Sequence, residues 1–236
     1  MTNIIFKNDD YDYDLKVNLN SLFNEEWIKF LGISFFKDKY FTNMIFKLNE
    51  TYNKKDVKIY PNKKDIFKLF KLTKPKENIV YIINCEPTYN KNNNGIAYGN
   101  KSNFFTEEYD NDLVNLFAKI NNYNSIKEKS SDYSLESWVK QGVFLYNVAL
   151  TGTSVSCHRA RWFKFTQYLI NKVSSFGQGT IFVLIGKNEN HKKMVRNSLD
   201  LKSVNLIEAE QLNYKLLNQI NAEIDLNYGP NYRIKW

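Results

Sequence analysis

The chain has 236 residues, of which 43% are apolar and 16% aromatic, so it has the material for a packed interior and is not a disordered segment. Lysine and arginine outnumber aspartate and glutamate by 33 to 25, and the net charge of +8 suits a polyanionic partner. An AT-rich genome would also enrich lysine and asparagine, so the charge alone assigns no partner.

Export and disulfide chemistry are not indicated by the sequence. The first residues, MTNIIFKNDDYDYD, lack the basic and apolar segments of a signal peptide, and no apolar run approaches the length of a membrane span. The two cysteines, Cys85 and Cys157, give neither a disulfide framework nor the spacing of a metal site. We therefore expect a soluble intracellular protein without a membrane partner, either cytoplasmic or made by a virus or phage in its host cell.

Amphipathic helices are predicted for the first third of the chain. Apolar residues recur at spacings of three and four over residues 20–31 and 39–52. A turn at Tyr60 and Pro61 leads to a third helix, with apolar residues between positions 66 and 72 and lysines on its other face. Those lysines are expected to form a solvated surface unless a polyanion binds there.

The rest of the chain alternates between buried strands and helices. Continuous apolar runs predict strands, which we place at residues 78–86, 142–150, 179–186 and 203–209. Periodic segments predict helices at residues 104–120 (with Thr106 as N-cap), 161–174, 190–199 and 212–224. This alternation predicts a three-layer α/β/α fold around a four-stranded, mainly parallel sheet. No repeat, linker or composition break interrupts it, so residues 1–236 are expected to form one domain.

The first of these strands ends in a carboxylate and a polar loop, in the stretch CEPTYNKNNNGIAYGN at residues 85–100. Open α/β sheets usually bind ligands at the carboxyl ends of their strands, so this loop is the predicted site. The sequence has no P-loop, dinucleotide fingerprint, metal-spaced Cys/His cluster or nucleophile elbow. We therefore expect neither a metal nor an organic cofactor.

The same stretch is the centre of a resemblance to the family 1 uracil-DNA glycosylases. Residues 59–87 resemble the family's Tyr-Pro turn, Ile-Phe helix and buried strand ending in Gly-Gln-Asp-Pro-Tyr-His. NGIAYGN at 94–100 is similar to its Gly-Leu-Ala-Phe segment, and residues 134–151 to its Leu-x-x-Trp-x-x-Gln-Gly-Val-Leu-Leu-Leu-Asn-x-x-Leu-Thr element. The family's Trp-x-x-Phe-Thr helix and its later strand, Gly and helix follow in the same order. The resemblance thus extends from about Trp27 to Trp236.

The resemblance implies a pocket for a uridine that is flipped out of DNA and read along its base edge. Asn147 would read the uracil, Tyr98 would stack on it, and Glu86 would position the attacking water. The predicted base pocket comprises Cys85, Pro87, Tyr89, Tyr98 and Asn147. Structural roles compete with this interpretation, because an Asn can cap a strand end and an aromatic residue can belong to the core.

Several positions of this loop depart from the family's pattern. Glu86 stands for the family's Asp and is one methylene longer, and a misplacement of about 1 Å can cost roughly a hundredfold in rate. Cys85 replaces the Gln that helps to bind the base. Thr88 replaces the Tyr that excludes thymine, and Tyr89 follows one position later. The Pro- and Gly-rich loop that grips phosphate has become the asparagine-rich segment 90–94.

A larger departure follows the last predicted strand, where the family has His-Pro-Ser and an apolar wedge that enters the minor groove. The His stabilises negative charge on the uracil, and removing such a stabiliser typically costs about a hundred- to a thousandfold. This chain runs from strand into helix as NLIEAEQLNYKLLNQI, without that His or the wedge. Its two histidines, His158 and His191, stand elsewhere and are expected to be exposed or part of the core.

Three functions fit this mixture of matches and departures. We favour a protein that has lost efficient uracil excision and binds DNA, single-stranded or uracil-containing, as a replication or repair accessory. The alternative is a divergent but active uracil-DNA glycosylase, in which Glu86 activates water and a backbone amide between Glu208 and Gln211 replaces the His. The third is a scaffold for a protein partner. The predicted phosphate contacts, which would make DNA binding salt-dependent, are Lys91, Lys101, Lys192, Lys193 and Arg196.

Overall fold

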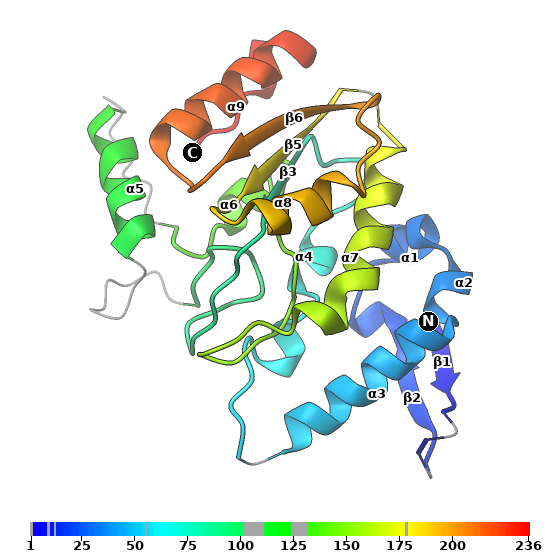
Figure 1. Ribbon diagram of the computed structural model, residues 1–236. Coiled ribbons are helices and arrows are strands. Elements are labelled where there is room, and N and C mark those ends of the chain that lie inside the picture. Colours follow the sequence, from blue (N-terminus) through cyan, green and yellow to red (C-terminus); the bar gives the residue numbers. More distant parts are fainter. Residues whose placement is uncertain are drawn as a thin grey trace.

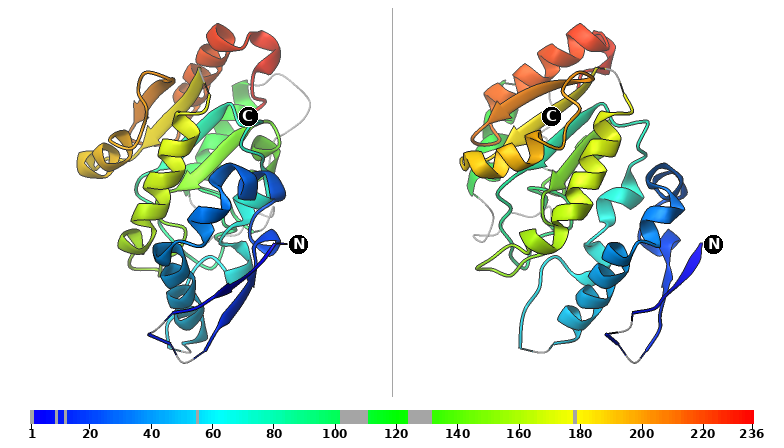
Figure 2. Two further views of the ribbon diagram at one scale, coloured as in Figure 1. Left: turned by 90° about the vertical axis from the view of Figure 1, so that its right-hand side faces the viewer. Right: turned by 45° about the vertical axis from the view of Figure 1, so that its right-hand side comes forward.

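The computed structural model describes residues 2–8, 10–11, 13–54, 56–101, 111–123, 132–177 and 179–236 (Figure 1). The predicted cap Thr106 and the start of its helix lie outside the described residues. Within them, strands and helices alternate along the chain as the apolar pattern predicts, and helices cover both faces of a central sheet (Figure 2).

The central sheet has the strand order β4-β3-β5-β6, and its strands are all parallel. They are β3 (Val80–Asn84), β4 (Val143–Asn147), β5 (Thr180–Ile185) and β6 (Val204–Ala209). Every residue of β3, β4 and β5 is buried, because a sheet covered on both faces needs no polar side. The register sets Asn84 beside both Asn147 and Ile185, so three strands end side by side.

Helices α7 (Arg159–Ser174) and α8 (Glu189–Arg196) lie on one face of the sheet, and α9 (Tyr214–Asn227) and α5 (Asn111–Tyr123) lie on the other (Figure 2). Right-handed crossovers require this arrangement. The connections through α7 and α8 cross the sheet in one direction, whereas the connection from β3 to β4 crosses it in the opposite direction. The short helix α6 (Glu136–Val139) leads into β4.

The N-terminal part of the chain forms a small antiparallel sheet and a group of helices beside α7 (Figure 1). The helices are α1 (Glu25–Leu31), α2 (Ile33–Phe36), α3 (Lys39–Asn53) and α4 (Lys68–Leu72). Single 3₁₀ turns occur at η1 (Leu19–Ser21), η2 (Lys63–Asp65) and η3 (Pro230–Tyr232). The antiparallel strands β1 (Asn3–Phe6) and β2 (Leu15–Asn18) were not predicted. The helix predicted over residues 20–31 begins only at Glu25, because the side chain of Asn24 caps it by accepting the N–H of Trp27 at 3.0 Å.

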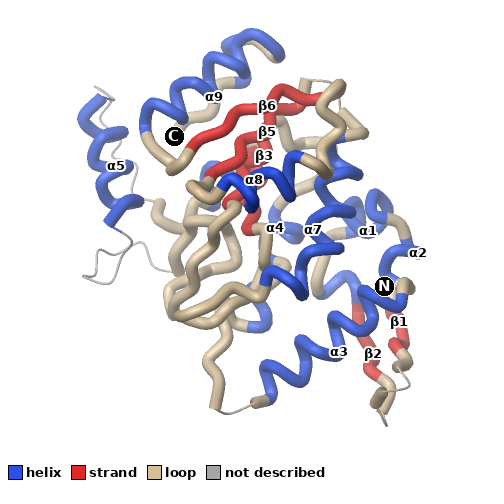
Figure 3. Tube along the Cα trace, in the orientation of Figure 1, coloured by secondary structure: helices blue, strands red, loops and turns tan. Residues whose placement is uncertain are grey.

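A cluster of buried aromatic rings joins these N-terminal helices to the sheet. Trp27 packs against Phe70 and Phe144 with centroids 5.2 and 5.3 Å apart, and Phe165 of α7 lies 5.8 Å from Phe70. These four side chains are fully buried, and each such burial stabilises the fold by about 1.5–3 kcal/mol. The long loops that follow β3 and β4 run together beside the carboxyl ends of the strands (Figure 3). In the described part of the chain, none of the helices combines the length and the apolar character needed to cross a membrane.

Candidate functional site

A cavity of about 270 Å³ lies at the carboxyl ends of the central strands, where an open α/β sheet usually binds its ligand. Its wall combines the strand ends, the loop after β3, part of α5 and the connection from β6 to α9. The residues that line it include Asn84, Glu86, Tyr98, Asn147, Gly186 and Gln211. Three residues implied by the resemblance, Glu86, Tyr98 and Asn147, therefore border the same space.

Two buried asparagines, Asn84 and Asn147, end neighbouring strands and line the cavity together. Nδ2 of Asn84 donates to Oδ1 of Asn147 at 2.9 Å, and Oδ1 of Asn84 accepts the backbone N–H of Glu86 at 3.2 Å. Both side chains lie on one face because the strands are parallel and in register. The sequence analysis singled out Asn147 and missed Asn84. Asn84 could have been found from the sequence, because it stands where the family's motif has Gly.

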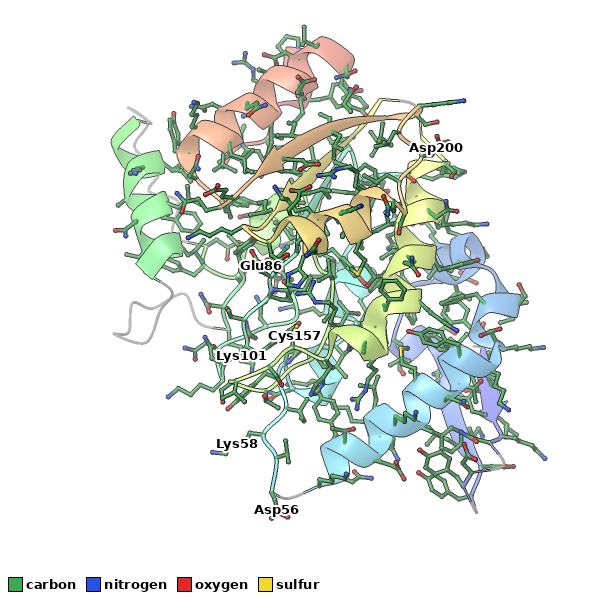
Figure 4. The ribbon with its side chains drawn as sticks, in the orientation of Figure 1. Asp56, Lys58, Glu86, Lys101, Cys157 and Asp200 are labelled. Atoms are coloured by element: carbon green, nitrogen blue, oxygen red, sulfur yellow. The ribbon has the colours of Figure 1, made fainter. Side chains whose placement is uncertain are left out.

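The carboxylate of Glu86 is bound at the start of α8 (Figure 4). Its Oε2 accepts the backbone N–H groups of Lys187 and Asn188, the second at 3.2 Å. Burial raises the pKa of Glu86, but these hydrogen bonds, the protonated form of His191 and the charge of Arg159 outweigh burial, so the pKa lies below its usual range. Glu86 is therefore ionised at neutral pH and is partly engaged by the helix end.

Gly186 provides the room for this arrangement. A Cβ at that position would lie 3.0 Å from Oε2 of Glu86 and 3.2 Å from Cβ of Cys85, both tight contacts. The strand-Gly-helix segment that matched the family in sequence thus brings the end of β5 against the end of β3. As a result, the first residues after β5 reach the carboxylate.

Neither histidine belongs to the described lining of the cavity. His191, in the first turn of α8, places Nδ1 3.7 Å from Oε1 of Glu86, a proximity that the sequence analysis did not predict. Burial and the nearby charge of Arg159 lower the pKa of His191, so its ring is neutral at pH 7. His158 lies just before α7, where its Nδ1 is 3.0 Å from Oγ1 of Thr151. Both rings are partly buried.

Tyr98 borders the cavity from the loop after β3. It has a φ of 65°, a left-handed conformation that costs a non-glycine residue of order 1–2 kcal/mol and is common at functional sites. The N–H of the preceding Ala97 donates to the carbonyl oxygen of Leu145 in β4 at 3.1 Å, which ties the loop to the sheet beside Asn147. The structure therefore places the Tyr98 side chain in the cavity wall and half-buried.

The asparagines of this loop hold its shape. Oδ1 of Asn94 accepts the N–H of Ile96 at 3.0 Å, while its Nδ2 donates to the carbonyl oxygens of Asn100 and Ser134 at 3.1 and 3.0 Å. Oδ1 of Asn90 accepts the N–H of Asn92 in a similar turn. Short amide side chains replace backbone partners in turns, which explains why asparagine is so frequent here.

The other predicted pocket residues, Cys85, Pro87 and Tyr89, are buried but are not part of the described cavity lining. Burial raises the pKa of the Cys85 thiol to about 12, so it is not a nucleophile at neutral pH. The hydroxyl of Tyr89 donates to the carbonyl oxygen of Ala149, and its ring packs against Gly152. Thr88, not Tyr89, borders the cavity.

The five predicted phosphate contacts fall into two groups. Lys91, Lys101 and Lys193 are exposed. Arg196 binds Glu208 through Nε at 2.7 Å and Glu189 through Nη2 at 2.8 Å. Lys192 lies 3.3 and 3.5 Å from the same two carboxylates. Glu189 and Glu208 therefore neutralise much of the positive charge of Lys192 and Arg196 on α8.

The connection from β6 to α9 is four residues long, and Glu210, Gln211 and Leu212 line the cavity from it. This is the place where the family's His-Pro-Ser segment would follow the last strand. A carboxylate, an amide and an apolar side chain therefore stand where the resemblance implies an imidazole. Among the residues that the structure describes, no three His, Cys, Asp or Glu side chains come together in a way that could hold a metal ion.

Comparison with known proteins agrees with this architecture, although no family model matches the chain. The uracil-DNA glycosylase of Mesomycoplasma hyopneumoniae is 31% identical over 175 residues, which cover 72% of this chain and 73% of that protein. The enzyme of that name from Clostridium perfringens is 31% identical over 189 residues, with coverage of 77% and 81%. The crystal structure of mimivirus uracil-DNA glycosylase matches with a TM-score of 0.70 and 19% identity, covering 90% of this chain and 87% of that one. This chain therefore belongs to the uracil-DNA glycosylase family.

Proposed function

We propose that this protein binds a uracil base, flipped out of DNA, in the cavity at the carboxyl ends of β3, β4 and β5, and that it excises the base poorly. In this proposal it acts as a uracil-recognising DNA-binding protein in replication or repair, folded as one domain over residues 1–236. The supporting observation is that Asn147 and Tyr98, from two distant parts of the sequence, line one cavity.

An amide beside an aromatic ring suits a flat, polar ligand such as a pyrimidine base. The Asn147 amide can hydrogen-bond to the base edge, and the ring of Tyr98 can stack on the base. The strained backbone at Tyr98 further supports a functional role, because left-handed non-glycine residues cluster at ligand sites. Binding and hydrolysis of this kind require no cofactor.

Three features of the same cavity argue against rapid hydrolysis. The Glu86 carboxylate already accepts two backbone N–H groups at α8, which restrains it from following a water molecule. The described lining contains no imidazole to stabilise charge on a departing uracil. Glu210 instead brings a carboxylate to this wall, and negative charge opposes the build-up of a uracil anion.

Contacts to the DNA backbone would come from lysines around the loops. Lys187 lines the cavity and is exposed, while Lys91 and Lys101 lie on the loop that contributes Tyr98. Lys193 is exposed on α8. We expect a smaller contribution from Lys192 and Arg196, because Glu189 and Glu208 already pair with them.

The second candidate function is a divergent but active glycosylase, and one observation favours it. Glu86 is held ionised and borders the same cavity as Asn147, so a water molecule between its second oxygen, Oε1, and the sugar could be positioned for attack. The two candidates differ in rate and not in what the cavity binds.

The experiment that tests the proposal uses excess protein and end-labelled single-stranded DNA carrying one uracil. Alkali treatment reveals abasic sites, and a native gel of the same mixture, run beside thymine and cytosine strands, reveals binding. We expect a uracil-dependent shift with little cleavage. Cleavage that is fast in the natural protein and lost in Glu86→Gln, but kept in the exposed control Glu25→Gln, would establish the active enzyme instead.

Absence of both shift and cleavage would contradict both candidates. Binding that is equal for uracil, thymine and cytosine strands and disappears at high salt would also contradict base recognition, because backbone contacts alone would then explain it. In that case a protein partner becomes the next ligand class to test.

A further inference from the structure

Asn84 stands where the family's motif has Gly. The orientation of its amide is fixed by the backbone N–H of Glu86, a group that can only donate a hydrogen bond. The backbone N–H of Glu86 is a donor, and it points at Oδ1 of Asn84 over 3.2 Å. The oxygen of this amide must therefore face Glu86, and its NH₂ group must face the other way. That NH₂ group lies 2.9 Å from the side chain of Asn147.

This contact determines the orientation of the second amide. A donor on Asn84 requires an acceptor on Asn147, so Asn147 turns its Oδ1 toward Asn84 and its own NH₂ toward the cavity that both residues line. Both side chains are buried, with exposed fractions of 8% and 9%. Rotating the Asn147 amide by half a turn would set two NH₂ groups against each other and leave both without a partner.

We propose that Asn84 is a specificity-determining positioning residue, which fixes the Asn147 amide so that it offers donors to the occupant of the cavity. The inference rests on the proposed function and extends it to a choice between bases. Uracil carries a carbonyl oxygen at C4, which accepts from NH₂, whereas cytosine carries an amino group there, which does not. Asn84 thereby favours a pyrimidine with a C4 carbonyl over one with a C4 amine.

The family's Gly could not exert this control, since it has no side chain to hold the neighbouring amide. With Gly at position 84 of this chain, Asn147 would lose the donor that fixes its oxygen. An Asn147 amide held in one orientation discriminates more strongly between the two bases. If cytosine enters the cavity, its C4 amino group meets the buried NH₂ of Asn147, and two donors then face each other. A single mismatched buried hydrogen bond of this kind corresponds to about a tenfold preference.

The test compares the natural protein with Asn84→Gly and Asn84→Asp in binding to strands that carry one uracil or one cytosine. Asn84→Gly should reduce the uracil-to-cytosine affinity ratio by about tenfold, because Asn147 becomes free to rotate. Asn84→Asp should reduce it further, because a carboxylate still accepts from Glu86 but now also accepts from Asn147, which turns its oxygen to the cavity. Unchanged ratios in two folded variants would overturn the inference while leaving the proposed function intact.

A second readout needs no DNA, so the failure of the inference and that of the proposed function remain distinct. The side-chain NH₂ resonances of Asn147 are assigned in ¹⁵N-labelled protein by their loss in Asn147→Asp. They should exchange quickly in the natural protein, where they face the cavity, and become protected in Asn84→Asp, where the carboxylate binds them. Protection in the natural protein, or no difference between the two, would overturn the inference even if no uracil binding were found.

Discussion

The cavity has two sides that relate differently to the family pattern. The side at the end of β4 holds Asn147 and Tyr98, which we propose to read the base, and Asn84 adds a contact that links Asn147 to Glu86. The opposite side, formed by the start of α8 and the β6–α9 connection, has a carboxylate bound to backbone amides and no imidazole in its described lining. In the proposed function, base reading depends on Asn147, which the sheet holds at a strand end, and on Tyr98, in a loop that Ala97 ties to β4. Hydrolysis depends on loops, which can be shortened without loss of the fold.

The largest effect is expected from removing the base-reading amide. Asn147→Leu has a similar volume but no hydrogen-bonding groups, so the preference for uracil over cytosine strands in direct binding should fall by about a hundredfold. The measurement is the ratio of the two dissociation constants, which cancels any change in backbone contacts. Asn218→Leu on the exposed side of α9 serves as the control and should keep the ratio. A ratio unchanged by Asn147→Leu would mean that this side of the cavity does not recognise the base.

A smaller change is expected on the hydrolytic side. Glu86→Asp shortens the side chain by one methylene and should withdraw the carboxylate from the N–H groups of Lys187 and Asn188 toward the cavity. Excision of uracil, measured under single-turnover conditions as alkali-labile sites, should rise by roughly tenfold, since errors of about 1 Å can cost a hundredfold. A rate equal to that of the natural protein would mean that the reach of Glu86 does not limit hydrolysis.

The sequence predicts this fold better than it predicts the site. Strands β3 to β6 are continuous apolar runs, and their alternation with helices leads directly to a parallel sheet with its polar residues gathered at one edge. The short strands β1 and β2 escaped notice, because four residues with partly exposed side chains carry too little pattern. That residues 1–236 form a single domain stays a prediction.

The sequence could not predict the contacts that single side chains make with residues far away along the chain. Glu86 was predicted at the site, but its bonds to residues about a hundred positions away depend on how β5 and α8 meet β3. In the same way, the sequence predicted Arg196 as a phosphate contact but did not show that the fold places Glu208 against it. Asn84 was the exception, because its departure from the Gly of the family's motif was visible in the sequence.

The stability of the α8 contact should depend on pH. The pKa values of Glu86 and His191 in the folded protein lie below their ordinary values. For each group, at a pH between its folded and its ordinary pKa, the unfolded chain therefore binds more protons than the folded one. Stability is therefore complete above the ordinary pKa of histidine and falls as the pH decreases through these values. Because Glu86 is partly exposed, we expect only about 1 kcal/mol from its charge.

Urea unfolding from about pH 7 to about pH 4 measures this dependence. Glu86→Gln, which can still accept the two N–H groups but carries no charge, should lose about 1 kcal/mol at neutral pH and nothing at the acid end. His191→Asn should remove only the part of the slope that lies just below the ordinary pKa of histidine. Equal slopes in the natural protein and Glu86→Gln would show that the carboxylate is not anchored at α8 in solution.

The smallest expected effect distinguishes two lysines on the hydrolytic side. Lys187 lines the cavity and is exposed, whereas the side chain of Lys192 is only 12% exposed and lies between Glu189 and Glu208. For single-stranded DNA, loss of one phosphate contact lowers the slope of log affinity against log salt by about 0.7. Lys187→Ala should show that change, and Lys192→Ala should show less, because its charge is already compensated within the protein. The reverse order would mean that DNA displaces the carboxylates from α8, and that the helix next to Glu86 takes part in binding after all.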